Sequence, residues 1–342
     1  MGQQFAFLLI LSLLGLAWSQ KSEHSLLKYG PFLNITYKEF REVADQARLE
    51  TAALLKPILD IKCQIHVNFE TEEMVIDPPV SGHVRARLCL VHQGSNPEKP
   101  VLVSLYDSLE YLRSKEPWLG FLNKAYYAEQ NDRTYYIWIG DLPPETRPTH
   151  KSRRDTIPIP WFECDEVEYG ELHAYKILAI FAVFELHDAP RKLLYLDSDV
   201  FIPFGSKYRP FSNIEENFND PAVSMIGNVR IQKTTKRTLI NTAHLGVRNT
   251  NFVKGLLGLW WQCNCGWRDQ HGLALTMTAY FSSMSPDLIL STKKLDLQHS
   301  HGAFNAYLFL RDHEDEIQRV QIVFSLRENQ KTLSLASLEN LP

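Results

Sequence analysis

The sequence lacks the features that mark several large classes of protein. It contains no internal repeat, no low-complexity tract and no series of coiled-coil heptads, which excludes solenoids, biased linkers and long paired helices. Basic residues do not outnumber acidic ones, and the formal net charge is −4. Because binding to nucleic acid depends on a basic surface, this balance gives no reason to expect a nucleic-acid partner.

Apolar runs long enough to cross a bilayer comfortably are also absent. The run from Phe5 to Trp18 is shorter than the about 20 residues that a spanning helix needs. It leads to Ala17 and Ser19, small residues at the spacing that signal peptidase accepts, so we expect residues 1–19 to be a signal peptide. No lysine or arginine precedes the run, which leaves a short membrane anchor retained in the Golgi as the alternative. Both interpretations place the protein in the secretory pathway, in the ER or Golgi lumen or outside the cell.

Cysteine is scarce and odd in number, with residues at five positions, Cys63, Cys89, Cys164, Cys263 and Cys265. The secretory route permits disulfides, and Cys63 and Cys89 are candidates for a local bridge. Cys263 and Cys265 have the spacing of half a zinc site, but the second cysteine pair that such a site needs is missing from the sequence. The N-glycosylation sequon Asn34-Ile35-Thr36 suits a surface position near the start of the mature chain.

A change of pattern divides the chain into two parts. Residues 20–99 hold an amphipathic helical pattern at 36–58 and β-forming residues at 64–92 that predict short strands or a hairpin. We interpret these residues as an N-terminal accessory or stem region. The main domain is expected at 100–325, and a C-terminal tail at 326–342.

Within the main domain, strand patterns alternate with helical patterns. Apolar runs of strand length occupy 101–106, 135–139 and 192–196, and helical patterns occupy 116–126 and 171–187. Alternation of this kind is typical of a parallel sheet. The sequence therefore predicts an α/β fold with a mainly parallel central sheet flanked by helices.

The most informative segment places two carboxylates directly after the strand pattern at 192–196. Asp197 and Asp199 follow this run, and three apolar residues follow Asp199. Open α/β sheets bind their ligands outside the carboxyl ends of the strands. Two acidic groups held this close repel one another unless they share a cation. We therefore expect a divalent metal that holds a phosphorylated substrate, and the alternative is a polar turn after a core strand.

Three later segments, 241–249, 260–270 and 299–305, carry further candidates. The first runs from polar residues into a strand pattern. The second holds tryptophans that offer apolar surface to a sugar ring or belong to the core, and its closing aspartate also suits a helix N-cap. The third holds two histidines at i and i+2 before a glycine, which favours a metal ligand in a chain with an acidic pair.

Together these motifs resemble those of a known family. Leu196-Asp197-Ser198-Asp199 resembles the Asp-x-Asp motif of GT-A glycosyltransferases, and the surrounding sequence is most similar to the retaining group that includes the glycogenins and plant and fungal xylosyl- and galactosyltransferases. The resemblance covers 101–305 and rests on four motifs in the same order. It implies a GT-A (nucleotide-diphospho-sugar transferase) fold. It also implies metal-dependent transfer of a sugar from a nucleotide-diphosphate sugar to a glycan, protein or lipid acceptor, with retention of configuration.

The resemblance further implies which residues bind the metal. Asp197 and Asp199 correspond to the carboxylates that bind Mn²⁺ or Mg²⁺, and this metal bridges the diphosphate of the donor. By analogy Asp199 is the stronger direct ligand, and Asp197 contacts both ribose and metal. The family's late histidine corresponds to His299 by its spacing to Gly302, and His301 is the alternative third ligand.

Other candidates lie around this pair. Asp269 and Gln270 resemble the family's Asp-Gln pair beside the reacting sugar and are the expected catalytic residues. Asn241 begins a stretch similar to the family's Asn-Ser/Thr-Gly strand, although Ala243-His244-Leu245 replaces its compact residues. Lys176, on the helical pattern before the acidic pair, is a candidate to assist the donor diphosphate, with a solvated helix face as the alternative.

Two other functions fit parts of the pattern. A phosphatase or phosphotransferase on a haloacid-dehalogenase-like fold would use Asp197 as nucleophile and Asp199 as acid, but the sequence has no Gly-Asp-x-x-x-Asp after residue 199. A non-catalytic carbohydrate-binding relative would keep the fold without turnover, and the unusual residues at 243–245 favour it.

Overall fold

The computed structural model describes residues 37–79, 85–142, 172–203, 211–221, 223–232, 237–262, 272–273, 276, 287–291, 298–299, 306–311 and 319–324. The expected signal peptide at 1–19 and the expected tail at 326–342 lie outside these residues. Among the helices that are described, none is both long enough and apolar enough to span a membrane.

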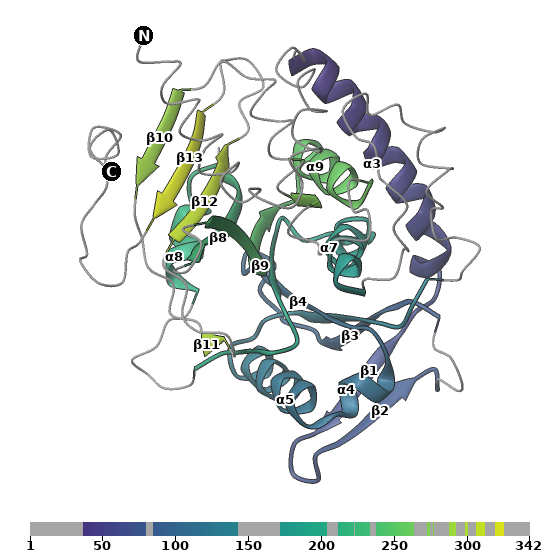
Figure 1. Ribbon diagram of the computed structural model, residues 1–342. Helices are drawn as coiled ribbons and strands as arrows, with labels where there is room; N and C mark the ends of the chain where they lie inside the picture. Colours follow the sequence, from purple (N-terminus) through teal and green to yellow (C-terminus); the bar gives the residue numbers. More distant parts are fainter. Residues whose placement is uncertain are drawn as a thin grey trace.

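The described chain is built on one 11-stranded sheet with helices on both faces (Figure 1). The strand order is β10-β13-β12-β8-β9-β6-β4-β5-β3-β1-β2. These strands are β1 (Gln64–Asn68), β2 (Glu73–Asp77), β3 (Arg87–His92), β4 (Val101–Tyr106), β5 (Tyr135–Ile139), β6 (Lys192–Leu196), β8 (Val223–Gln232), β9 (Arg237–Arg248), β10 (Asp287–Ser291), β12 (Ala306–Arg311) and β13 (Arg319–Phe324). A separate two-stranded sheet pairs β7 (Val200–Phe201) with β11 (Gln298–His299). The helices are α3 (Tyr37–Leu59), α4 (Leu109–Arg113), α5 (Lys115–Gln130), the 3₁₀ turn η4 (Leu172–Ala174), α7 (Tyr175–Phe184), α8 (Ser212–Asn217) and α9 (Asn251–Gln262).

The α/β class is confirmed, but the expectation of a mainly parallel sheet is wrong for the described strands. The parallel neighbours are β1·β3, β4·β5, β4·β6 and β10·β13. The other six pairs of neighbours are antiparallel. Short connections explain part of this difference, because residues 69–72 join β1 to β2 and residues 233–236 join β8 to β9. A parallel pair needs a crossover of a dozen or more residues, so connections this short join antiparallel strands only.

The parallel centre of the sheet consists of β5, β4 and β6, and these confirm the strands predicted at 101–106, 135–139 and 192–196. From β4 the chain crosses to β5 through α4 and α5, and from β5 it crosses to β6, on the other side of β4, through α7. Right-handed crossovers that run in opposite directions place their helices on opposite faces of a sheet. Accordingly, α5 and α7 lie on opposite sides of β4 (Figure 1).

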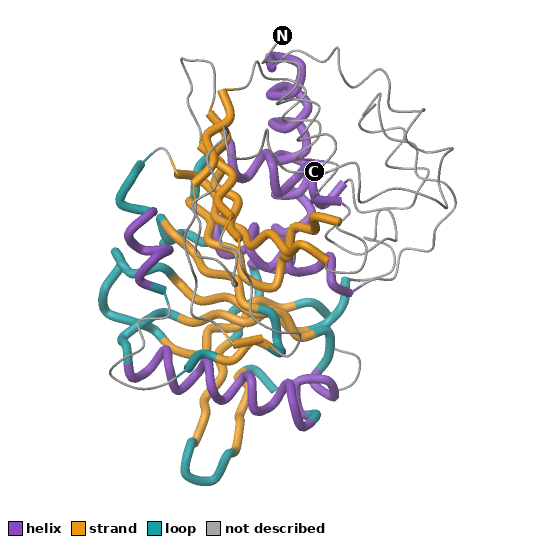
Figure 2. Tube along the Cα trace, turned by 60° about the vertical axis from the view of Figure 1, so that its left-hand side comes forward, coloured by secondary structure: helices purple, strands orange, loops and turns teal. Residues whose placement is uncertain are grey.

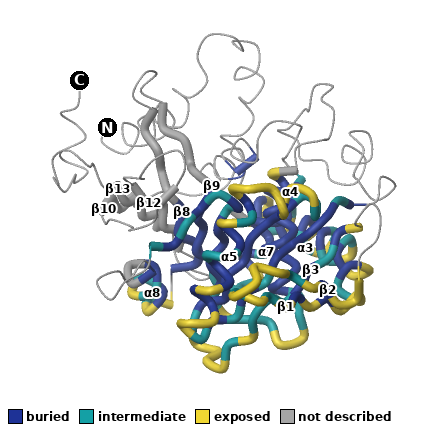
Figure 3. Tube along the Cα trace, turned by 90° about the horizontal axis from the view of Figure 1, so that it is seen from below, coloured by how far each residue is buried: buried dark blue, intermediate teal, exposed yellow. Residues whose placement is uncertain are grey.

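Alternating side chains of the central strands supply a core on each face. On β4, Val101, Val103 and Leu105 join the core around α7, whereas Leu102 and Tyr106 join the core around α5. α7 is buried along its whole length, and buried residues continue into the central strands (Figure 3). Both faces of the sheet centre are therefore buried, as a parallel sheet requires.

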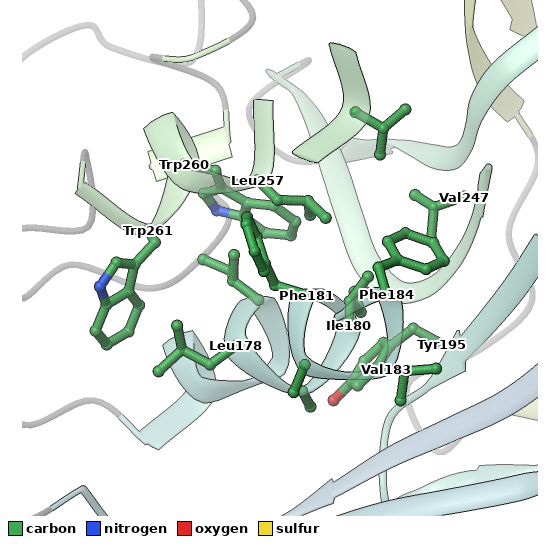
Figure 4. Close-up of a cluster of buried hydrophobic side chains, with 14 of the residues drawn as sticks. Leu178, Ile180, Phe181, Val183, Phe184, Tyr195, Val247, Leu257, Trp260 and Trp261 are labelled. Atoms are coloured by element: carbon green, nitrogen blue, oxygen red, sulfur yellow. The ribbon is translucent and has the colours of Figure 1, made fainter. Parts of the chain in front are cut away.

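The core on the α7 face includes two of the tryptophans considered as sugar platforms. Trp260 and Trp261 belong to α9, are 1% and 5% exposed, and lie in the cluster that includes Phe181 of α7 (Figure 4). Trp260 and Trp261 are therefore core residues and do not offer a surface to a sugar ring. Their burial stabilises the packing of α9 on α7.

The described part of the expected accessory region shares this core. Phe40, Ala44 and Ala47 of α3 are buried together with α7 and α9. Gly258 of α9 lies so close to α3 that a Cβ atom there would come within 2.7 Å of the Ala47 carbonyl oxygen. The absence of a side chain at this position is thus what allows the two helices to touch.

The strands predicted between 64 and 92 also join the main sheet. β1 and β2 form a hairpin that projects from the body of the molecule (Figure 2), and β1 and β3 continue the sheet beyond β5. Cys63 and Cys89 form the disulfide that was a candidate from the sequence. Residues 37–79 and 85–99 are therefore continuous with the main domain in both sheet and core.

Candidate functional site

The carboxyl ends of β4 and β6 lie side by side where the strand order reverses. β4 lies between β5 and β6 and is parallel to both, and the chain leaves it first toward β5 and later reaches β6 on the other side. A switch point of this kind is where open α/β sheets bind their ligands. Asp107 follows β4 and Asp197 follows β6. The acidic pair, Asp197 and Asp199, thus lies at the carboxyl ends of the central strands, where ligands bind.

Asp197, Ser198 and Asp199 form a tight turn, which we call the acidic turn. The Asp197 N–H donates to the Ala243 carbonyl of β9 at 2.9 Å, and the Val200 N–H donates back to the Asp197 carbonyl at 3.1 Å. Ser198 is buried, while the two aspartates are half-buried. Both carboxylates are therefore on a restrained backbone and remain partly accessible to a ligand.

Lys176 reaches this turn from α7. Its Nζ atom is 2.9 Å from Asp197 Oδ1 and 3.2 Å from Thr242 Oγ1, and the side chain is only 3% exposed. The Tyr195 hydroxyl donates to the same Oδ1 atom at 2.8 Å. The alternative of a solvated face is therefore wrong for Lys176. Its ammonium group offsets part of the repulsion between the two carboxylates that the sequence assigned to a metal alone.

A second buried lysine, Lys124 of α5, supports the turn from the opposite face of the sheet. Its Nζ donates to the Ser198 carbonyl at 3.0 Å and to the Gly120 carbonyl at 3.1 Å, and the residue is fully buried. Desolvation lowers the pKa of Lys124 from 10.5 to about 7, and the charges of Asp199 and Asp197 oppose this shift. The acidic turn therefore lies between two lysines that approach it from opposite faces.

Tyr111 of α4 contacts the acidic turn through Ser198. Its hydroxyl lies 2.9 Å from Ser198 Oγ, and the residue is 39% exposed. Burial raises the pKa of the Tyr111 hydroxyl, and its hydrogen bond to Ser198 partly counters that effect. Ser108 is the N-cap of α4, and its Oγ accepts the Tyr111 N–H at 3.0 Å. Tyr111 thus offers a fixed, partly exposed aromatic surface beside the carboxylates.

Lys124, Tyr111 and Thr242 belong to the site but are not among the residues predicted from the sequence. For Lys124 a signal was present, because it occupies the buried stripe of α5 that also contains Phe121 and Ala125. A lysine in an apolar helical stripe needs a polar partner, which here is a backbone carbonyl. For Tyr111 and Thr242, only the tertiary structure brings them to the acidic turn.

The backbone of His299 lies close to the acidic turn. In the β7·β11 pair, His299 is the register partner of Val200, the residue that follows Asp199. The segments that carry the candidate ligands Asp199 and His299 are therefore neighbours across a two-stranded pairing, although the two residues are 100 positions apart in the sequence. Asn241 lies in β9 opposite Asn228, one position before Thr242.

Three of the predicted site residues, Asp269, Gln270 and His301, lie outside the described residues. Among the side chains that the structure does describe, no three acidic, histidine or cysteine groups gather to hold a metal. The chemistry of Asp197 and Asp199 fits Mn²⁺ or Mg²⁺, because both supply hard oxygen ligands on one turn, and the backbone of the third candidate ligand, His299, lies in register with Val200. The hydrogen bonds from Lys176 and Tyr195 to the Asp197 carboxylate both reach Oδ1, which is compatible with a cation on the other oxygen.

Lys124 makes a testable contribution to stability. Between pH 7 and 10.5 the unfolded chain keeps the proton that folded Lys124 has lost, so the stability of the folded protein at this position rises with pH. The stability of the wild type relative to Lys124→Met should increase by about 2 kcal/mol from pH 7 to pH 9 in urea titrations. The exposed Lys115→Met serves as the control and should show no such trend. A constant difference between wild type and Lys124→Met would contradict the lowered pKa.

Comparisons with known proteins add no relative to this geometry. The chain matches no protein-family model, and no curated protein and no solved structure is significantly similar to it.

Proposed function

We propose that this protein is a metal-dependent glycosyltransferase that transfers a sugar from a nucleotide-diphosphate sugar to a glycan, protein or lipid acceptor, with retention of configuration, in the lumen of the secretory pathway. The observation that carries the proposal is the acidic turn at the switch point between β4 and β6, with His299 in register with Val200. A nucleotide diphosphate with a divalent cation is the ligand that best suits two carboxylates at such an edge. The resemblance to GT-A glycosyltransferases points to the same chemistry.

In the proposed site, Asp197, Asp199 and His299 would hold Mn²⁺ or Mg²⁺. When bound, this cation supplies Lewis-acid stabilisation of the charge that develops on the leaving diphosphate. Lys176 and Tyr195 hold Asp197 through its Oδ1 atom, so the carboxylate needs little reorganisation when the donor binds. Asp269 and Gln270 remain the proposed groups beside the reacting sugar, where a developing oxocarbenium ion needs a polar or carboxylate neighbour.

The test is a thermal-shift panel of UDP- and GDP-sugars on the full chain, each with and without Mn²⁺. One nucleotide sugar should raise the melting temperature in the presence of Mn²⁺ only, because a ligand at about 100 times its dissociation constant adds about 2.7 kcal/mol of stability. Release of free nucleoside diphosphate from that donor should follow the same metal dependence. Stabilisation without any release would favour the non-catalytic carbohydrate-binding relative.

The phosphatase alternative is tested with a generic phosphate ester under the same conditions. Hydrolysis of that ester, lost in Asp197→Asn and without any response to nucleotide sugars, would replace the glycosyltransferase proposal. The structure gives Asp197 two hydrogen-bond donors on one oxygen, Lys176 and Tyr195, so nucleophilic attack would have to come from its other oxygen.

The two candidate histidines give a further prediction. Because His299 is the residue in register with Val200, His299→Ala should raise the Mn²⁺ dissociation constant more than His301→Ala does. Isothermal titration with Mn²⁺ measures both variants side by side. A larger loss in His301→Ala would assign the third ligand to His301.

A further inference from the structure

One side of α5 faces the backbone that forms and follows the acidic turn. Gly120, Asn123 and Lys124 lie at i, i+3 and i+4 on this helix and therefore project to the same side. All three make close contacts with residues 198–202. The helix thus reaches the proposed ligand-binding turn through backbone atoms, which are the same for any sequence in the turn.

Gly120 provides the closest approach. A Cβ atom at this position would lie 2.2 Å from the Ser198 carbonyl oxygen and 3.4 Å from Lys124 Nζ. The atom in the way belongs to the backbone, so it cannot rotate aside. Only glycine lets the Ser198 carbonyl come this near to the helix, and the position is helical, where glycine is otherwise unfavourable.

Asn123 and Lys124 fix the same backbone by hydrogen bonds. Asn123 acts as a two-way clamp, since its Oδ1 accepts the Ile202 N–H at 2.7 Å and its Nδ2 donates to the Ile202 carbonyl at 3.0 Å. Lys124 donates to the Ser198 carbonyl at 3.0 Å from a fully buried position. The two ends of the segment that contains Asp199 are therefore both fastened to α5.

We propose that Gly120, Asn123 and Lys124 form a positioning platform on α5, which holds the acidic turn in the conformation that binds the divalent cation of the nucleotide-sugar site. These are positioning residues, because they act on the backbone between the carboxylates and not on the ligand. The assignment of the cation rests on the proposed function. The assignment of the platform rests on the contacts of α5 alone.

The experiment compares two glycine-to-alanine variants of the full chain. Gly120→Ala places a methyl group against the Ser198 carbonyl, whereas the matched control Gly258→Ala places one 2.7 Å from the Ala47 carbonyl, in the α3–α9 contact. Both add a single methyl group to a packed helix, against backbone atoms of a neighbouring segment. Titration with Mn²⁺ alone, followed by the loss of the free-ion electron paramagnetic resonance signal, should give a dissociation constant raised about 10- to 100-fold in Gly120→Ala. In Gly258→Ala it should stay within about twofold of the wild type.

A second variant and a second measurement keep the outcomes distinct. Asn123→Ala removes the clamp on Ile202 without adding volume, so it should also weaken Mn²⁺ binding. This variant still tests the platform if Gly120→Ala does not fold. If the wild type binds Mn²⁺ and both platform variants bind it equally well, the platform is overturned and the proposed function stands. If the wild type binds no Mn²⁺, the proposed function fails, and hydrogen exchange decides the platform. Faster exchange of the Val200 and Ile202 amides in Gly120→Ala than in Gly258→Ala supports the platform, and equal exchange overturns it.

Discussion

Replacing Asp199 with alanine is expected to abolish metal-dependent nucleotide binding and turnover while the fold stays intact. Asp199 follows the carboxyl end of β6 on a half-buried turn, and it is the proposed direct ligand of the cation. Loss of a direct ligand should raise the Mn²⁺ dissociation constant by more than about 100-fold, since even loss of an outer-shell partner costs 10- to 100-fold. Isothermal titration with Mn²⁺, and the release of nucleoside diphosphate, measure the two effects.

The fold should survive the loss of Asp199 because its side chain is partly exposed, so the unfolding free energy should change by no more than about 1 kcal/mol. Asp188→Ala is the matched control, since it removes an exposed carboxylate from the connection that precedes β6 and should change neither binding nor stability. Unchanged turnover in Asp199→Ala would remove the basis of the proposed function.

Replacing Asp197 with alanine is expected to have a different and larger effect on stability. Asp197 is the ion-pair partner of Lys176 at 2.9 Å, and the Lys176 side chain is 3% exposed. Removal of one partner of a buried pair leaves the other charge without compensation, which typically costs 3–5 kcal/mol. Asp197→Ala should therefore lower the unfolding free energy by about that amount in urea titrations, in contrast to Asp199→Ala.

The double variant Lys176→Met/Asp197→Ala separates stability from binding. With both charges gone, the buried space near Thr242 and Tyr195 holds an apolar side chain, and most of the stability lost in Asp197→Ala should return. Mn²⁺ binding should remain lost, because a carboxylate ligand is still missing. Equal stability of Asp197→Ala and Asp199→Ala would contradict this prediction, because it would show that Asp197 does not compensate the buried charge of Lys176.

Local sequence patterns predicted the central strands and helices well, for a physical reason. The runs at 101–106, 135–139 and 192–196 are buried on both faces, so nearly every residue in them must be apolar whatever the neighbouring strands are. The Asp-Ser-Asp segment then ends the apolar run of β6, and this places its two carboxylates at the carboxyl end of that strand. Direction could not be predicted in the same way, because a strand pattern is the same for a parallel and an antiparallel neighbour, as the β9 partner of β6 illustrates.

The position of Lys176 shows where residue-level reasoning reaches its limit. A lysine on a helix is usually solvated, and residue type alone does not distinguish Lys176 from such a residue. The surrounding α7 residues are apolar on every side, however, and this is the pattern of a helix buried all round. In such a helix a lysine must find a negative partner inside the protein, and the structure supplies Asp197.

By itself, the sequence determined that this protein has apolar central strands with two carboxylates at the end of one of them. The reason is that buried strands require apolar residues, whereas the exposed carboxyl ends of those strands accept charged ones. Only the tertiary structure decided which groups surround those carboxylates. Lys176 reaches Asp197 from α7, Lys124 and Gly120 reach the Ser198 carbonyl between the two carboxylates from α5, and the backbone of His299 pairs with Val200 across β7 and β11. These approaches depend on crossover handedness, strand order and close backbone contact, which are properties of the folded chain that no local pattern carries.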